Sequence, residues 1–231
     1  MTRNPAKHPA IPSRRHWGLL GAAFAVLVAA SVLLIAQTAQ YFSFDFRFAF
    51  FLERPFLTTD RVWAACFYMH VAGGILCLAT APLLLWNGLA RGHQGLHRAL
   101  GRIHAVAALG WVGPTGLYLA PFAKGGAAGQ LGFLLLGLWF VATSGLGIVA
   151  IRRRDLSAHV AWMVRSYALI LSALSFRILH RVLHELGVAA TTNYVASTWA
   201  SLVLAIVSGE VLGRRLASTW REPALVPAAI P

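Results

Sequence analysis

Charged residues are scarce in this chain, and acidic residues are the scarcest of them. Of 231 residues only 12% are charged, with 7 Asp and Glu against 20 Lys and Arg, while 58% are apolar. A soluble domain usually has about a quarter of its residues charged, and this chain has too few polar groups to cover so much apolar surface. The composition excludes an ordinary soluble domain and indicates a protein that lies in a membrane.

The sequence also lacks cysteine pairs and the motifs of common soluble enzymes. Cys66 and Cys77 are eleven residues apart in one apolar run, which separates them by about 16 Å along a helix, too far for a disulfide. There is no Gly-x-x-x-x-Gly-Lys loop, Gly-x-Ser-x-Gly elbow or His-Glu-x-x-His pair. These absences argue against soluble nucleotide or hydrolase chemistry.

Apolar runs of about 20 residues recur along the chain, which is the length that crosses a hydrocarbon core of about 30 Å. Five runs are close to this length, and a sixth, in the fifth span, is broken by arginines. We therefore expect an all-α, polytopic membrane bundle of about six transmembrane helices. The expected spans are Trp17 to Gln37, Val62 to Trp86, Leu100 to Phe122, Leu131 to Ile151, His159 to His180 and Tyr194 to Leu212. They make one domain of residues 17–212, with a working core in residues 62–184.

The basic residues are distributed unevenly over the connections between these spans. Thirteen Arg and Lys residues flank the connections on one side and five flank those on the other. The positive-inside rule assigns the richer side to the cytoplasm, so both termini are expected there, as a basic tail of residues 1–16 and a tail of residues 213–231. Topology and anionic membrane lipid account for the basic excess, and nucleic acid is not an expected partner.

The first span has two interpretations. Arg14 and Arg15 before an apolar run resemble a twin-arginine export signal, and residues 36–39 include small side chains that suit cleavage. We favour an uncleaved anchor, because the run is longer and more apolar than a typical signal core and the topology rule already explains the arginines.

Phenylalanine alternates with other residues from Phe42 to Phe50, between the first and second spans. Such alternation is typical of a strand, but a lone strand at the edge of a bilayer would leave its backbone unpaired. We therefore expect an aromatic belt at the outer interface, ended by Pro55.

Histidine and arginine side chains inside the spans are the candidates for function, because a central arginine costs roughly 2.5 to 3.5 kcal/mol on insertion scales. The histidines share helical faces with small and polar residues in the second, third and fifth spans. With the topology above they divide by depth. His70 and His180 form an outer pair, and His104 and His159 form an inner pair.

Two histidine pairs at two depths on facing helices are what bis-histidine haem ligation in a four-helix core requires. Arg177 near the outer pair, and Arg102 and Arg165 near the inner pair, suit haem propionates. Glu210 lies inside a span and can pair with Arg165. Two other interpretations stay open: the side chains at helix ends are ordinary interfacial groups, or the arginines and histidines line a path for an anion or a proton.

The run from His70 to Arg177 resembles a bacterial membrane family catalogued as domain of unknown function 2306. The residues that carry the resemblance are His70-x-x-Gly73-Gly74, Pro82 with Trp86, Leu96-His97-Arg98-x-x-Gly101-Arg102, Gly125-Gly126, His159-x-x-Trp162-Met163-x-Arg165-Ser166-Tyr167-Ala168 and Arg177. His104 stands where the family often has tyrosine, which moves the inner ligand toward His97. The resemblance implies a helical membrane domain and supplies no activity.

The resulting expectation is a multi-pass protein of the bacterial inner (plasma) membrane that binds haem b and transfers electrons. It would serve as a membrane oxidoreductase subunit, with membrane lipid around it and a quinone or another redox partner. The candidate cofactor-binding residues are His70, His97, His104, His159, His180, Arg102, Arg165 and Arg177. The alternative is a non-enzymatic transport, assembly or lipid-binding module that uses its intramembrane arginines and histidines.

Overall fold

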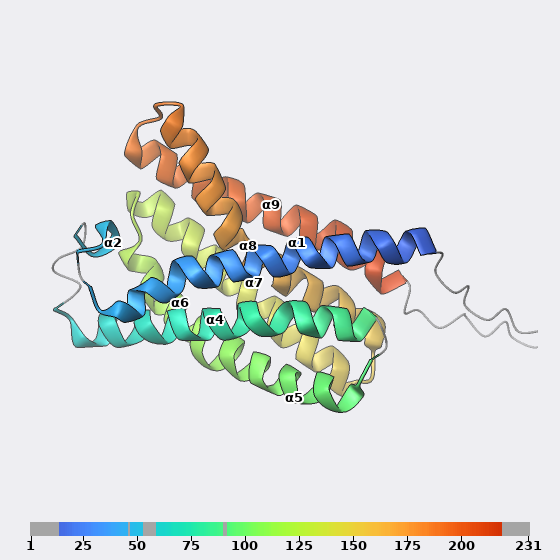
Figure 1. The fold of residues 1–231 in the computed structure, drawn as a ribbon. Helices are drawn as coiled ribbons and strands as arrows, with labels where there is room; N and C mark the ends of the chain where they lie inside the picture. Colours follow the sequence, from blue (N-terminus) through green and yellow to red (C-terminus); the bar gives the residue numbers. More distant parts are fainter. Residues whose placement is uncertain (1–13, 46, 53–58, 90–91, 219–231) are drawn as a thin grey trace, which may run out of the picture.

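The computed structural model describes residues 14–45, 47–52, 59–89 and 92–218. These residues are helical or in turns, without a strand, and six of the helices are long and apolar enough to cross a membrane. Figure 1 shows the long helices packed side by side in one bundle. The expected all-α bundle of six spans is confirmed.

The helices extend beyond the spans expected from hydropathy, because hydropathy marks only the part of a helix that lies in hydrocarbon. The long helices are α1 (Arg14–Ala39), α4 (Arg61–Leu89), α7 (Gly126–Arg152), α8 (Leu156–Glu185) and α9 (Ala190–Ser218). The third span is built from α5 (Gln94–Ala105), the π-helix η2 (Val106–Val112), α6 (Gly113–Leu119) and the 3-10 turn η3 (Ala120–Phe122). Short elements η1 (Gln40–Ser43) and α2 (Ala49–Leu52) follow α1.

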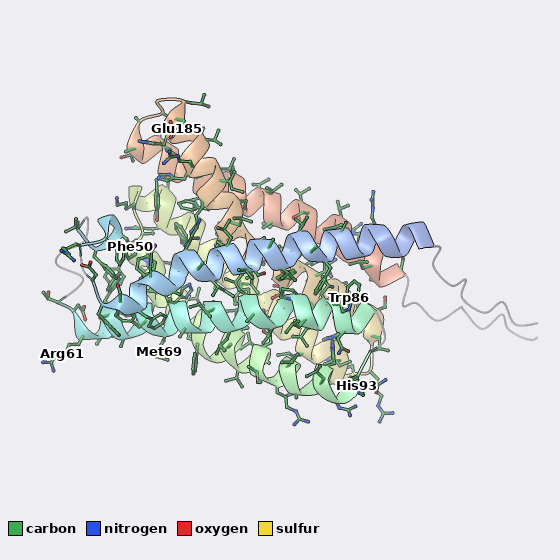
Figure 2. The ribbon with its side chains drawn as sticks, in the orientation of Figure 1. Phe50, Arg61, Met69, Trp86, His93 and Glu185 are labelled. Atoms are coloured by element: carbon green, nitrogen blue, oxygen red, sulfur yellow. The ribbon has the colours of Figure 1, made fainter. Side chains whose placement is uncertain are left out.

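The start of α1 and the end of α9 lie at the same end of the bundle (Figure 1), as an even number of crossings requires. Figure 2 places His93 at that end and Phe50, Arg61 and Glu185 at the opposite end. Assignment of the His93 end to the cytoplasm stays a prediction from the positive-inside rule. We call the two ends the inner and outer ends on that basis.

Pro114 explains the break in the third span. Proline has no backbone N–H and clashes with the carbonyl one turn before it. Just ahead of it the chain adopts the wider π-helix, and the Gly113 N–H donates to the carbonyl of Ala108, five residues back. π-helical turns are rare in proteins and are frequently found at functional sites.

Small residues on α9 allow the most extensive helix contact in the described chain, which is between α8 and α9. A methyl group added at Gly213 would lie 2.9 Å from the Ala161 carbonyl oxygen, and one at Gly209 would lie 3.1 Å from the Arg165 Cα. Such close approach is how helices associate in a bilayer. The expected core of residues 62–184 therefore packs directly against the last helix.

The first helix also packs against that core. It runs along α4 and touches α8 (Figure 1), where the Ser31 Oγ and the Tyr167 Oη are 3.4 Å apart in a buried hydrogen bond. The contact joins the first span to the fifth, so α1 packs against both α4 and α8.

The aromatic segment expected at the outer interface folds into a packed cluster over the outer end of α4. The Phe67 ring lies 5.3 Å from Tyr41, 5.2 Å from Phe50 and 5.2 Å from Trp63, between ring centroids. Phe51 and Trp63 are buried, whereas Phe44 stays exposed. Pro55, the expected end of the segment, lies outside the described residues.

Candidate functional site

His70 faces the third span from α4. Its Nδ1 lies 3.1 Å from the Val112 carbonyl oxygen and 3.3 Å from the Thr115 Oγ1. The Thr115 hydroxyl already donates to the Trp111 carbonyl, so the Nδ1 of His70 carries the proton and donates it to Val112. Gly116 makes room for the ring, because a methyl group there would lie 3.0 Å from the His70 Cε1. The Nε2 of His70 is thereby the nitrogen with a free lone pair.

His104 lies deeper in the same interface and is 4% exposed. Its Nδ1 is 2.8 Å from the Thr80 Oγ1, and the Thr80 hydroxyl donates to the Leu76 carbonyl. The histidine is therefore the donor to Thr80. Two His–Thr contacts thus join α4 to the third span at two depths. In one contact the histidine lies on α4 and the threonine on the third span, and in the other these positions are exchanged.

His97 on α5 and His159 on α8 both lie near the inner end. The Nδ1 of His159 lies 2.8 Å from the Gly147 carbonyl on α7, which again leaves Nε2 with the free lone pair. His97 lies close enough to His159 for their charges to interact, and its own Nδ1 is buried with no hydrogen-bond partner in the described chain. The choice between His97 and His104 as the inner partner of His159 stays a prediction.

His180 lies among aromatic rings near the outer end of α8. Its ring stacks on Phe176 at 5.6 Å and meets Tyr194 edge-on at 6.1 Å. Its Nδ1 is buried without a hydrogen-bond partner among the described residues. No hydrogen bond or ring contact within the described ranges joins His180 to His70, so these two expected partners face different neighbours.

Arg165 has the carboxylate partner that the sequence predicted. Its Nε donates to the Glu210 Oε2 at 2.7 Å, and its guanidinium lies 4.5 Å above the Trp162 ring centroid. Arg214 binds the other oxygen of Glu210. The predicted pairing of Arg165 with Glu210 is confirmed, and the charge of Arg165 is matched inside the protein.

Arg177 and Arg102 differ from Arg165 in having no carboxylate partner among the described residues. Arg177 is partly buried, donates to the Ala173 carbonyl at 2.9 Å and interacts electrostatically with Tyr41. Arg102 is exposed and lines a groove on the outside of the bundle. Of the three predicted arginines, only Arg177 is both inside the bundle and without a carboxylate partner among the residues that the structure describes.

The sequence reasoning missed the hydroxyl groups that pair with the histidines. Thr80 follows His70 by ten residues and Thr115 follows His104 by eleven. In two antiparallel helices, this near-equal spacing allows both contacts to form together, and it is the signal that would have found them. A further buried pair, Ser144 and Ser166, joins α7 to α8 at 2.7 Å.

No three His, Cys, Asp or Glu side chains in the described ranges come together in a group that could hold a metal ion. Cys66 and Cys77 are both free thiols, as their spacing predicted.

Residues 67–213 match the model of a family described as a predicted membrane protein, DUF2306. The match covers more than half of the chain. It runs to Gly213 near the end of α9, beyond Arg177, where the resemblance seen in the sequence ends. No curated protein and no solved structure matches the chain.

Proposed function

The chain belongs to the DUF2306 family of predicted membrane proteins, and we propose that it binds haem b and transfers electrons within the membrane. The ligands would be His97 with His159 toward the inner end and His70 with His180 toward the outer end. One observation carries the proposal. Each pair combines a histidine whose Nδ1 is fixed on a backbone carbonyl with a histidine whose Nδ1 is buried and unpartnered.

The first member of each pair has the orientation that an iron-ligating histidine usually has. Such a ring donates its second N–H to a carbonyl or carboxylate, which fixes the tautomer and holds the ring in place. His70 does this on Val112, and His159 does it on Gly147. In both rings the Nε2 keeps its lone pair and can bind a metal.

The second member of each pair has a buried Nδ1 with no hydrogen-bond partner among the described residues. Buried ring nitrogens without a partner are uncommon, and leaving one unpaired costs about 1–3 kcal/mol. His97 and His180 both have such a nitrogen. Iron bound at this Nδ1 would supply the missing partner.

When bound, haem b supplies a one-electron couple that the chain itself lacks. The chain contributes apolar helices that exclude water, and Arg177 is the cation available for a propionate because it is partly buried and has no carboxylate partner within the described residues. His104 donates to Thr80, and we assign it to holding α5 against α4 rather than to ligation. Electrons would pass between the two depths to a quinone or another redox partner.

The proposed location is the inner membrane of a bacterium, with the protein acting as a membrane oxidoreductase subunit. The positive-inside rule supports the orientation, and the two depths of the histidines support transfer across the bilayer.

An absorption spectrum tests the proposal. Protein expressed with haem supply should show a Soret band, and His70→Ala or His159→Ala should each lose about half of its absorbance, because one of two sites is removed. His184→Ala is the control, since His184 is exposed on α8. A folded protein with no Soret band contradicts the proposal.

Arg177 favours a second function, a path for an anion or a proton in a transport or assembly module. A guanidinium inside the bundle without a carboxylate attracts anions. In proteoliposomes, Arg177→Leu should then reduce anion or proton flux in a protein that keeps its helical content. Equal flux in the two proteins would exclude this path.

A further inference from the structure

An apolar groove with one basic residue at its end runs along the outside of the third span. It has a volume of about 310 Å³, and it is lined by Leu76, Arg102, Ile103, Val106, Ala107 and Trp111. Leu76 comes from α4, and the rest come from α5 and the π-helix. Because it opens away from the bundle, this groove is separate from the buried histidines.

The π-helix shapes this groove. Three of its lining residues, Val106, Ala107 and Trp111, belong to the π-helix ahead of Pro114. Val106 is 61% exposed beside the groove, while the small Ala107 is buried beneath it. His104 points the other way, toward Thr80. The third span therefore has a polar face inside and an apolar, hollowed face outside.

The length of the groove matches one leaflet of a bilayer. Arg102 and Trp111 are nine residues apart, or about 13 Å at the rise of a helix. Half of a hydrocarbon core is about 15 Å. A chain held in the groove would run from the headgroup level at Arg102 toward the bilayer centre at Trp111.

The positive charge of Arg102 at one end of the groove determines which chemical group a bound ligand must have there. Arg102 is the last charged residue before an uncharged run that continues to Ala123, so it stands where the polar start of α5 gives way to hydrocarbon. No carboxylate pairs with it within the described ranges. A phosphate oxygen would fit the guanidinium, and the rest of the lining is apolar.

We propose that this groove is a selective site for an anionic phospholipid, with its phosphate on Arg102 and one acyl chain along Ile103, Val106 and Trp111. The site is independent of haem binding. It assigns Arg102 to binding a lipid rather than a haem propionate. It also gives the π-helix a role on the lipid-facing surface of the bundle.

Native mass spectrometry of the delipidated full-length protein tests the site, with phosphatidylglycerol and phosphatidylcholine of the same chains as probes. One phosphatidylglycerol should bind more tightly than phosphatidylcholine. Arg102→Gln should weaken its binding about fivefold, which corresponds to about 1 kcal/mol for one basic residue near an anionic surface. The matched control is Arg153→Gln, which removes the same charge from an exposed connection outside the groove.

A second pair of variants tests the groove rather than the charge. Val106→Trp fills it from the exposed side and should abolish the selective adduct, whereas Val203→Trp, at an equally exposed position on α9, should keep it. The Soret band should stay the same in Arg102→Gln as in the unaltered protein.

Three results would overturn the proposal. The first is equal affinity for the two phospholipids, and the second is equal loss in Arg102→Gln and Arg153→Gln. The third is displacement of phosphatidylglycerol by a quinone together with no effect of Arg102→Gln, which would assign the groove to an isoprenoid chain. Should Val106→Trp fail to fold, the two arginine variants decide alone.

Discussion

The two halves of the bundle handle polar groups in different ways. Between α4 and the third span the polar side chains are histidines, each held by one nitrogen on a neighbouring helix, with the other nitrogen left over. Between α8 and α9 the neutral side chain of Asn193 donates to the His180 carbonyl, and the charges of Arg165, Glu210 and Arg214 satisfy one another. A charge that is neutralised within the protein holds helices together, whereas a histidine held through one nitrogen keeps a second nitrogen that can bind a ligand, as we propose for His70 but not for His104.

The half of the bundle formed by α8 and α9 is closely packed. Breaking its ion pair between Arg165 and Glu210 should have the largest effect on stability. Glu210→Gln leaves the guanidinium of Arg165 without its counter-charge, with only 15% of that side chain exposed. We expect the thermal unfolding midpoint in detergent to fall further than in any other variant considered below. Glutamine keeps the size of the side chain, so the loss reports on charge. An unchanged midpoint would show that Arg165 is solvated.

Gly213→Ala should separate α8 from α9 and destabilise the protein by about 1–3 kcal/mol, the cost of overpacking. The added methyl would lie 2.9 Å from the backbone oxygen of Ala161, which cannot move without its helix. The control is Gly145→Ala, where nothing lies within 4 Å and no loss is expected. Equal stability of the two variants, measured by thermal unfolding, would mean that the helices separate at no cost.

In the histidine half, Thr80→Val should cost about 1–3 kcal/mol, because it leaves the buried Nδ1–H of His104 without an acceptor. Thr115→Val should cost less, since His70 keeps the Val112 carbonyl. Thermal unfolding checks the order, and Thr80→Ser should restore stability because it restores the hydroxyl. Equal costs at Thr80 and Thr115 would contradict the assignment of the His70 proton to Val112.

The sequence predicted the spans well, because each helix contains a run of bilayer length with connections sorted by charge. It also predicted the pairing of Arg165 with Glu210, since Glu210 is the carboxylate available inside a span. It missed the contacts of His70 and His104 with threonine, because these depend on the register between two helices. Helical periodicity gives the face of a residue but not the residue opposite it.

The same limit applies to the inner histidine and to the π-helix. His97 and His104 are seven residues apart and share one helical face, so periodicity alone could not choose between them. In the structure His104 contacts Thr80, and His97 lies near enough to His159 for their charges to interact, while the choice of ligand stays a prediction. Pro114 marks a break in the third span, but proline sterics do not specify whether the chain kinks or widens.

The smallest effect is expected for an ion pair outside the bilayer, between Asp45 and Arg47 after η1. The Arg47 guanidinium, through its hydrogen bonds and charge, lowers the pKa of the Asp45 carboxyl from its usual 3.8. A lowered pKa contributes stability above the unfolded value, and this contribution is lost as the pH falls through the folded value. Because the pair is exposed, solvent screens it strongly. Asp45→Asn should therefore change the unfolding midpoint slightly at pH 7 and not at all at a pH below the folded value, whereas the effect of Glu210→Gln at pH 7 should be large. An equal loss of thermal stability in Asp45→Asn and Glu210→Gln would mean that an ion pair inside the bilayer contributes no more to stability than one outside it.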